Sequence, residues 1–273
     1  MDKKKVLIVT QEMKPYTALS EISEIARKLP QYVQENGMEI RVLMPRFGTI
    51  NERRHRLHEV VRLSGMNIIV DDDDFPLIIK VASLPGARMQ VYFLDNEDFF
   101  KRKSVFEDDQ GQPFEDNTDR MIFFCKGVIE TVKKFGWAPD IVHCHGWMTS
   151  LVPMYLKTAY AKEPIFQNSK VVYSMYERSL EKAFSDEFVS KASINNLDPK
   201  DLVTYKGDDD NITLHKGAVN FADAIIRGSE SLSDADEGLL TDIKKPTLEF
   251  LSEEEYLPAY LELYNSLLEQ EVE

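Results

Sequence analysis

Two histidines and a cysteine alternate within VHCHGWMTS, the segment from Val142 to Ser150. Such side chains can bind a metal ion, act as a nucleophile or transfer protons, and their spacing favours some of these uses over others. Successive residues of a strand point to opposite faces, so His143 and His145 would share one face and Cys144 the other. Zinc ligands must converge on one point, and no second group of ligands accompanies these three in the sequence. We therefore expect neither a metal site nor a bound cofactor here.

Cys144 is expected to be a small core residue. A nucleophilic thiol needs exposed, electropositive surroundings that lower its pKa, whereas the strand DIVHCHGW is largely apolar. Cys125 is the only other cysteine among 273 residues, and a lone pair in a chain of this length does not indicate a disulfide framework. A reducing, cytoplasmic location fits this cysteine content.

The two histidines allow two interpretations. In the first, His143 is a hydrogen-bonded core residue and His145 is a turn residue packed beside Trp147. In the second, both serve a ligand site, because open α/β sheets bind ligands beyond the carboxyl ends of their strands. The residue types alone leave both interpretations open.

The elements around this motif predict an α/β fold with a doubly wound, mostly parallel sheet and helices on both faces. Residues 6–10 form an apolar run typical of a strand buried on both sides. Residues 18–37 have helical spacing, with Ser20 as a possible N-cap, Pro30 as a bend or break and Gly37 as a stop. The further predicted elements are a strand at 38–45, short mixed strands between 51 and 95, a helix from 116 capped by Asn117 or Thr118, a strand at 138–147, a helix at 148–162, a strand at 170–176, and a helix from 215 running into a strand at 224–227.

The C-terminal part changes in composition. Residues 229–252 are rich in serine and acidic residues, and we expect an acidic surface connection there. Residues 253–273 contain an amphipathic helix, expected to pack on the same domain, residues 1–228. Its predicted apolar stripe consists of Leu257, Leu261, Tyr264 and Leu268.

Composition excludes several function classes. Lysine and arginine number 33 against 47 acidic residues, giving a net charge of −14, so we expect no nucleic-acid partner. No run approaches the ~18 apolar residues of a membrane span, so we expect no membrane partner. The acidic runs 71–74 and 208–210 lack a calcium-loop pattern and are expected to be solvated turns. No Gly-x-Ser-x-Gly elbow supports a hydrolase.

Six segments occur in the same order as similar segments of bacterial glycogen and starch synthases: KKVLIVTQEMKPY, RVLMPRFG, VYFLDNEDFF, PFEDNTDRMIFFCKG, GWAPDIVHCHGWMTSLVPMYLK and LHKGAVNFADAII. The chain resembles the N-terminal Rossmann-like domain of these GT-B glycosyltransferases. The resemblance implies transfer of glucose, with retention, from ADP-glucose to an α-1,4-glucan. A chain ending at Glu273 is expected to lack the second domain, and the final helix resembles the one that returns from that domain in full-length synthases.

The resemblance also assigns site residues. His145 matches a histidine that lies beside the sugar, although Gly146 stands where the family has aspartate. Asp116 is the second expected catalytic residue. Glu12, Asn117 and Trp147 are expected to bind substrate.

The loop that faces phosphate in the family departs from the family pattern. Lys-Thr-Gly-Gly-Leu in the family corresponds to ALSEISE here, with Ala18 at the lysine and Ser20 and Glu21 at the glycines. Glycines let backbone N–H groups approach a pyrophosphate, and lysine supplies the opposing charge. Glu21 would instead repel a diphosphate, by about 1 to 4 kcal/mol near 4 Å.

Two functions follow. The first is a synthase-like protein that is inactive alone. The second is a non-catalytic module of glycogen metabolism that binds glucan or a partner enzyme. The candidate partners are an α-glucan, a sugar nucleotide, and a protein or second copy at the face left by the absent domain.

Overall fold

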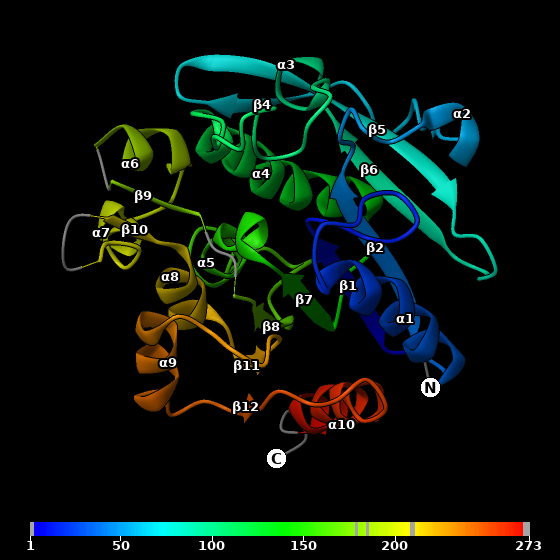
Figure 1. Cartoon of the computed structure of the whole chain (residues 1–273), viewed down its shortest axis with the longest axis vertical. Helices are drawn as coiled ribbons and strands as arrows, with labels where there is room; N and C mark the ends of the chain where they lie inside the picture. The colour runs from blue at the N-terminus through cyan, green and yellow to red at the C-terminus, as the bar shows by residue number, and fades with distance from the viewer. Residues whose placement is uncertain (1–2, 178–179, 184–185, 208–210, 270–273) are drawn as a thin grey trace.

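The computed structural model describes residues 3–177, 180–183, 186–207 and 211–269, and is shown in Figure 1. The predicted acidic turn at 208–210 lies outside these residues. Within them, no helix has the length and apolar content needed to cross a lipid bilayer.

The centre of the sheet is parallel, in the order β12-β11-β8-β7-β1-β2-β6. The short apolar runs predicted as strands form its middle, and β1 and β7 are buried along nearly their whole length. The doubly wound, mostly parallel α/β fold is therefore confirmed. The strands are β1 (Lys5–Thr10), β2 (Glu39–Pro45), β6 (Gln90–Asp95), β7 (Ile141–His145), β8 (Lys170–Met175), β11 (Ala224–Arg227) and β12 (Thr247–Leu248).

Helices cover both faces of this sheet. α1 (Ile22–Glu35) packs beside α10 (Tyr256–Glu269), and these two lie together in Figure 1. α4 (Asn117–Phe135), α5 (Leu151–Lys157) and α8 (Leu214–Phe221) form a second contiguous layer. The apolar side chains between the layers and the sheet make one continuous core.

The predicted mixed excursion is confirmed as an antiparallel extension at one edge. β5 (Asp73–Ser83) pairs antiparallel with β6, with β3 (His58–Glu59) and with β4 (Met66–Val70). Val70 pairs with Asp73, so Asp71 and Asp72 form the turn between β4 and β5, and Asp71 adopts a φ of 59°.

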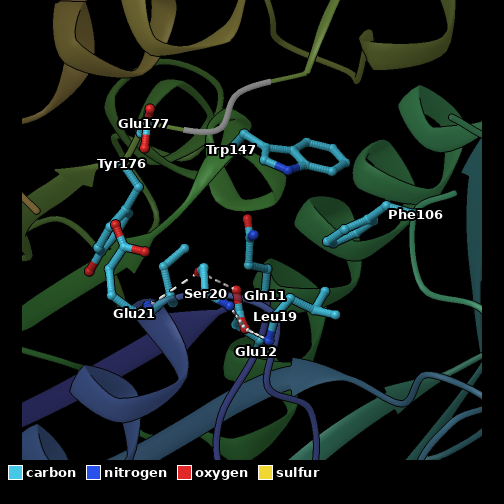
Figure 2. A pocket seen from close by; sticks show the side chains of 10 residues that line it. Gln11, Glu12, Leu19, Ser20, Glu21, Phe106, Trp147, Tyr176 and Glu177 are labelled. Atoms are coloured by element: carbon cyan, nitrogen blue, oxygen red, sulfur yellow. Dashed lines mark hydrogen bonds between the residues drawn. The ribbon is translucent and has the colours of Figure 1, made fainter. Parts of the chain in front are cut away.

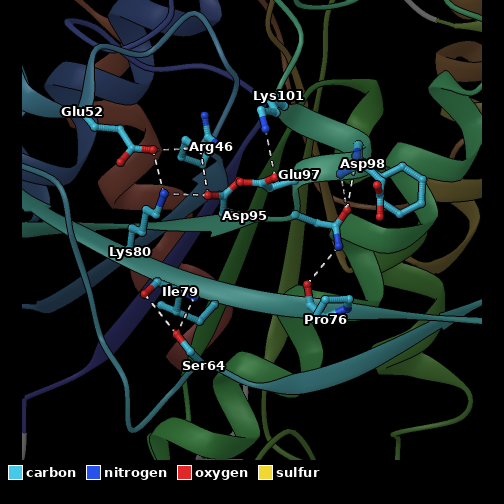
Figure 3. A network of polar contacts seen from close by, with 12 residues as sticks. Arg46, Glu52, Ser64, Pro76, Ile79, Lys80, Asp95, Glu97, Asp98 and Lys101 are labelled. Atoms are coloured by element: carbon cyan, nitrogen blue, oxygen red, sulfur yellow. Dashed lines mark hydrogen bonds and ion pairs between the residues drawn. The ribbon is translucent and has the colours of Figure 1, made fainter.

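A charged network holds this extension to the parallel strands (Figure 3). Asp95, at the end of β6, forms ion pairs through Oδ2 with Arg46 Nε and with Lys80 Nζ, both at 2.9 Å. Glu52 of α2 (Glu52–His55) pairs with Lys80 at 2.7 Å. Burial alone would lower the pKa of Lys80, but the hydrogen bonds that Lys80 donates to Asp95 and Glu52 outweigh it and raise that pKa.

Several local expectations are corrected. Pro30 does not end α1; it is buried inside the helix, and packing of that face offsets the lost backbone hydrogen bond. The N-cap of α4 is Asp116, and neither Asn117 nor Thr118 caps it, because helical conformation already begins at Asn117. The helix predicted at 148–162 is shorter, a 3₁₀ turn at Trp147–Thr149 followed by α5.

The C-terminal part is more ordered than expected. Within 229–252, α9 (Asp234–Thr241) is capped by the Ser233 side chain, and β12 joins β11 as a parallel edge strand. The buried face of α10 is Tyr256, Tyr260, Tyr264, Leu267 and Leu268, whereas Leu257 and Leu261 are only partly buried. The remaining short elements are α3 (Glu97–Phe100), α6 (Asp186–Ala192), α7 (Pro199–Val203), β9 (Glu181–Ala183) and β10 (Asn211–Thr213).

Candidate functional site

A cavity of about 210 Å³ opens beyond the ends of β1, β7 and β8 (Figure 2). This is the carboxyl edge of the parallel strands, where open α/β sheets bind ligands. No lysine or arginine is among the described residues that line it. The lining residues are Gln11, Glu12, Leu19, Ser20, Glu21, Ile22, Phe106, Trp147, Tyr176 and Glu177.

Glu12 follows β1 and is bound by the loop that precedes α1. Its Oε2 accepts the backbone N–H groups of Leu19 and Ser20 at 2.5 and 2.9 Å, and its Oε1 accepts the Ser20 hydroxyl at 2.6 Å. Burial raises the pKa of Glu12, and these hydrogen bonds offset part of the increase. Backbone N–H groups at the start of a helix are the donors that normally bind phosphate. Leu19 and Ser20 lie in the loop directly before the N-cap residue Glu21 of α1, and the protein's own carboxylate occupies their N–H groups.

The rest of the lining is acidic and aromatic. Glu21 accepts a hydrogen bond from the Ser229 hydroxyl, and the backbone N–H of Glu177 donates to that same hydroxyl at 3.0 Å. The rings of Phe106 and Trp147 lie 4.9 Å apart at 57°. Carboxylates accept hydrogen bonds from hydroxyl groups, and aromatic faces pack against apolar surface. Such a lining suits a neutral polyhydroxylated ligand and disfavours an anion.

His143 and His145 lie on one face of β7, as the alternation predicted. Both side chains are fully buried, and their rings stack with centroids 3.8 Å apart at 34°. Burial lowers the pKa of His143 well below its usual range, with a smaller contribution from His145, and burial lowers the pKa of His145 to about 3. Both imidazoles are therefore neutral at pH 7.

Each histidine bonds to hydroxyl groups from other elements. His143 Nδ1 lies 2.5 Å from the Tyr264 hydroxyl of α10, and its Nε2 lies 2.7 Å from Ser174 Oγ of β8. His145 Nδ1 lies 2.8 Å from the Tyr176 hydroxyl. His145 Nε2 is buried without a hydrogen-bond partner among the described residues. His145 thus stands behind the cavity and contacts it through Tyr176.

The other predicted site residues fall into two groups. Glu12 and Trp147 line the cavity. Asp116 and Asn117 do not line it. The Asp116 carboxylate accepts hydrogen bonds from both terminal guanidinium nitrogens of Arg102, each at 2.6 Å. Asn117 Nδ2 donates to the backbone carbonyl of Phe106 at 2.8 Å. Asn117 therefore supports a wall of the cavity from behind.

Gly146 ends β7 in a conformation that favours glycine, with a φ of 83°. A Cβ at this position would lie 2.3 Å from Gln11 Oε1. That same oxygen accepts the Met148 N–H at 3.3 Å. The carboxamide of Gln11 therefore occupies the space that a side chain at residue 146 would need.

Sequence reasoning missed Gln11, Phe106, Tyr176 and Glu177 as lining residues. Tyr176 and Glu177 follow β8 directly, so their place after a predicted strand was an available signal. Phe106 lies in an irregular segment, and no pattern in the sequence marks it.

The cysteines are core residues, as expected for Cys144. Both are fully buried, and burial raises the pKa of the Cys125 thiol to about 12 and that of Cys144 well above its usual value. Within the described parts of the chain, no group of three or more His, Cys, Asp or Glu side chains could hold a metal ion.

Comparison with known sequences gives a consistent result. A model of the starch synthase catalytic domain matches residues 5–237. A glycogen synthase of Chlorobaculum tepidum is 38% identical over 232 residues, which are 83% of this chain and 46% of that protein. A glycogen synthase of Pelodictyon phaeoclathratiforme is 41% identical over 173 residues, 63% of this chain and 35% of that protein. The chain thus spans about a third to a half of these relatives.

The fold also matches a solved structure, the catalytic domain of starch synthase IV from Arabidopsis thaliana bound to ADP and acarbose. The TM-score is 0.76, with 18% sequence identity, over 92% of this chain and 52% of that one. At 18% sequence identity, this match shows that the two chains share a fold.

Proposed function

Because the chain belongs to the starch synthase catalytic domain family, we propose that it is a glucan-binding domain of that family that does not transfer glucose by itself. One observation carries this proposal: the Glu12 carboxylate occupies the N–H groups of Leu19 and Ser20, in the loop that corresponds to the phosphate-facing loop of the family. The family reaction needs a diphosphate leaving group to be stabilised by positive charge. The cavity offers three carboxylates instead.

Binding of a neutral sugar remains compatible with this cavity. Trp147 and Phe106 supply apolar ring faces, and Glu21 and Glu177 supply acceptors for sugar hydroxyls. The starch synthase IV structure contains both ADP and acarbose. We propose that this chain binds a saccharide, as acarbose is, and does not bind a nucleotide such as ADP.

The test is titration calorimetry of the purified chain with maltooligosaccharides, ADP and ADP-glucose. We expect a maltooligosaccharide to bind and ADP to give no heat. Binding of ADP, or release of ADP from ADP-glucose in the presence of glucan, would contradict the proposal. Binding of none of these would also contradict it, and would favour instead a role in binding a protein partner or a second copy of the chain.

The two tryptophans allow a matched control for the location of the site. Trp137 lies before β7 and donates its indole N–H to Glu39 at 2.6 Å, far from the residues that line the cavity. In Trp137→Phe, fluorescence comes from Trp147 alone and should change when the sugar binds. In Trp147→Phe, it comes from Trp137 alone and should not change.

A further inference from the structure

The C-terminal helix contacts the cavity through a continuous path of polar side chains. Tyr264 is fully buried, and its hydroxyl meets His143 Nδ1 at 2.5 Å, 121 residues away in the sequence. The two rings meet edge to face, with centroids 5.7 Å apart at 84°. α10 is therefore joined to β7 by a directional contact in addition to its apolar packing.

His143 has a hydroxyl on each ring nitrogen, Tyr264 on one side and Ser174 on the other. A neutral imidazole has one donor and one acceptor nitrogen, so one hydroxyl donates to the ring and the other accepts from it. Both contacts fix the ring plane, because the two nitrogens point in different directions. Without the Tyr264 hydroxyl, Ser174 would be the hydrogen-bond partner left to the His143 ring among the described residues.

His145 depends on this orientation more than an ordinary buried histidine would. Its ring stacks 3.8 Å from that of His143, and its only hydrogen-bond partner in the described chain is the Tyr176 hydroxyl, because Nε2 has none. A rotation of the His143 ring must therefore displace His145. Tyr176 in turn is confined on its other side by Gly228, where a Cβ would come within 2.5 Å of the Tyr176 ring.

We infer that Tyr264 of α10 is a positioning residue for the cavity, which acts through the stacked His143 and His145 to fix the Tyr176 phenol in the cavity wall. The inference rests on the proposed glucan-binding function. It assigns the buried histidine pair the role of connecting the C-terminal helix to the ligand. The pair is then neither a metal site nor a proton-transfer group.

The test uses Tyr264→Phe in the full chain, because this change keeps the ring and removes only the hydroxyl. We expect the dissociation constant for a maltooligosaccharide to rise about five-fold. We also expect the ¹⁵N signals of the His145 imidazole to move in NMR spectra of the ligand-free protein. Loss of packing alone would not change the hydrogen bonding of a histidine that Tyr264 does not touch.

Tyr256→Phe is the matched control. Tyr256 lies on the same helix and is buried, but its hydroxyl has no partner in the described chain. Neither the dissociation constant nor the His145 signals should change in this variant. If Tyr264→Phe does not fold, His143→Gln interrupts the path at the ring that joins Tyr264 to His145, and it should move the same His145 signals and weaken binding of the maltooligosaccharide.

The outcomes separate this inference from the proposed function. If the unmodified chain binds no sugar, the proposed function fails, and the His145 signals alone decide whether the path exists. If the sugar binds and Tyr264→Phe changes neither the affinity nor the His145 signals, the inference is overturned. Movement of the His143 signals alone would also overturn it, because the path would then end at β7.

Discussion

Gly146 and Gln11 illustrate how single residues define this site. Gly146 has φ 83° and ψ 167°, a conformation that costs an L residue on the order of 1–3 kcal/mol. The resemblance to the synthases places an aspartate at this position. Here the Gln11 carboxamide fills the space beside Gly146 and accepts the Met148 N–H, so Gln11 in this conformation leaves no room for a side chain at residue 146.

The first prediction concerns this pair. Gly146→Ala should lower the free energy of unfolding by about 3 kcal/mol, from backbone strain and from the clash with Gln11. Adding Gln11→Ala should restore about 1 kcal/mol of that loss, since it removes the clash but not the strain. Urea denaturation of the four proteins of this cycle measures both terms. No recovery in the double variant would mean that backbone strain accounts for the whole effect.

The second prediction concerns the buried histidines. His143 and His145 stay neutral in the folded protein, because burial lowers their pKa values, that of His145 to about 3. Below pH 6.5 the unfolded chain therefore binds protons that the folded chain does not. The free energy of unfolding consequently decreases as the pH is lowered. The loss at pH 5 should be about 2 kcal/mol from His145, and His143 should add to it in the same direction.

Urea denaturation between pH 7.5 and pH 5 checks this result. The slope of the free energy of unfolding against pH reports how many protons the chain takes up when it unfolds. His145→Gln should reduce that number by about one. An unchanged dependence in that variant would show that His145 is already protonated in the folded state.

At the scale of elements, the antiparallel extension depends on a junction of charges. β5 and β6 pair through their backbones, and ion pairs join Arg46, which follows β2, and Lys80, within β5, to Asp95 at the end of β6 (Figure 3). Asp95 is 4% exposed. Removing one member of a buried ion pair leaves the other charge uncompensated, which costs more than the pair itself contributes.

Asp95→Asn should therefore lower the free energy of unfolding by about 3 kcal/mol. The exposed pair Glu97–Lys101 lies immediately beside it and supplies the control. Glu97→Gln should leave stability unchanged within the error of urea denaturation, because solvent screens an exposed pair. Equal effects of the two substitutions would mean that the network at Asp95 is no more important than a surface pair.

At the scale of the whole molecule, charge limits what the cavity can bind. The chain carries a net charge of −14, and none of the described residues lining the cavity is basic. The electrostatic field of this negative charge should not change the affinity for a neutral glucan. Its dissociation constant should stay within about two-fold between about 50 and about 500 mM sodium chloride, as measured by calorimetry. A strong weakening by salt would show that ionic contacts hold the ligand, contrary to the proposed mode of binding.

Local pattern determined the framework of the fold. Two kinds of pattern could be recognised in the sequence because burial on one or both faces imposes a period on it. These are the apolar runs of β1, β2, β7, β8 and β11, and the helical spacing of α1, α4 and α10. α9 and β12 were not predicted. Each is short and mostly exposed, so neither imposes such a period on the serine-rich, acidic segment that contains it.

The same limit applies to the site. Alternation along β7 was enough to predict that His143 and His145 share a face, and position at the end of a strand was enough to place Trp147 near the carboxyl edge. Glu12 was assigned through the resemblance to the synthases. Only the tertiary structure decided what the histidines do, because their partners, Ser174, Tyr176 and Tyr264, come from other elements. A hydrogen bond across 121 residues depends on how α10 packs, and no period in the sequence encodes that contact.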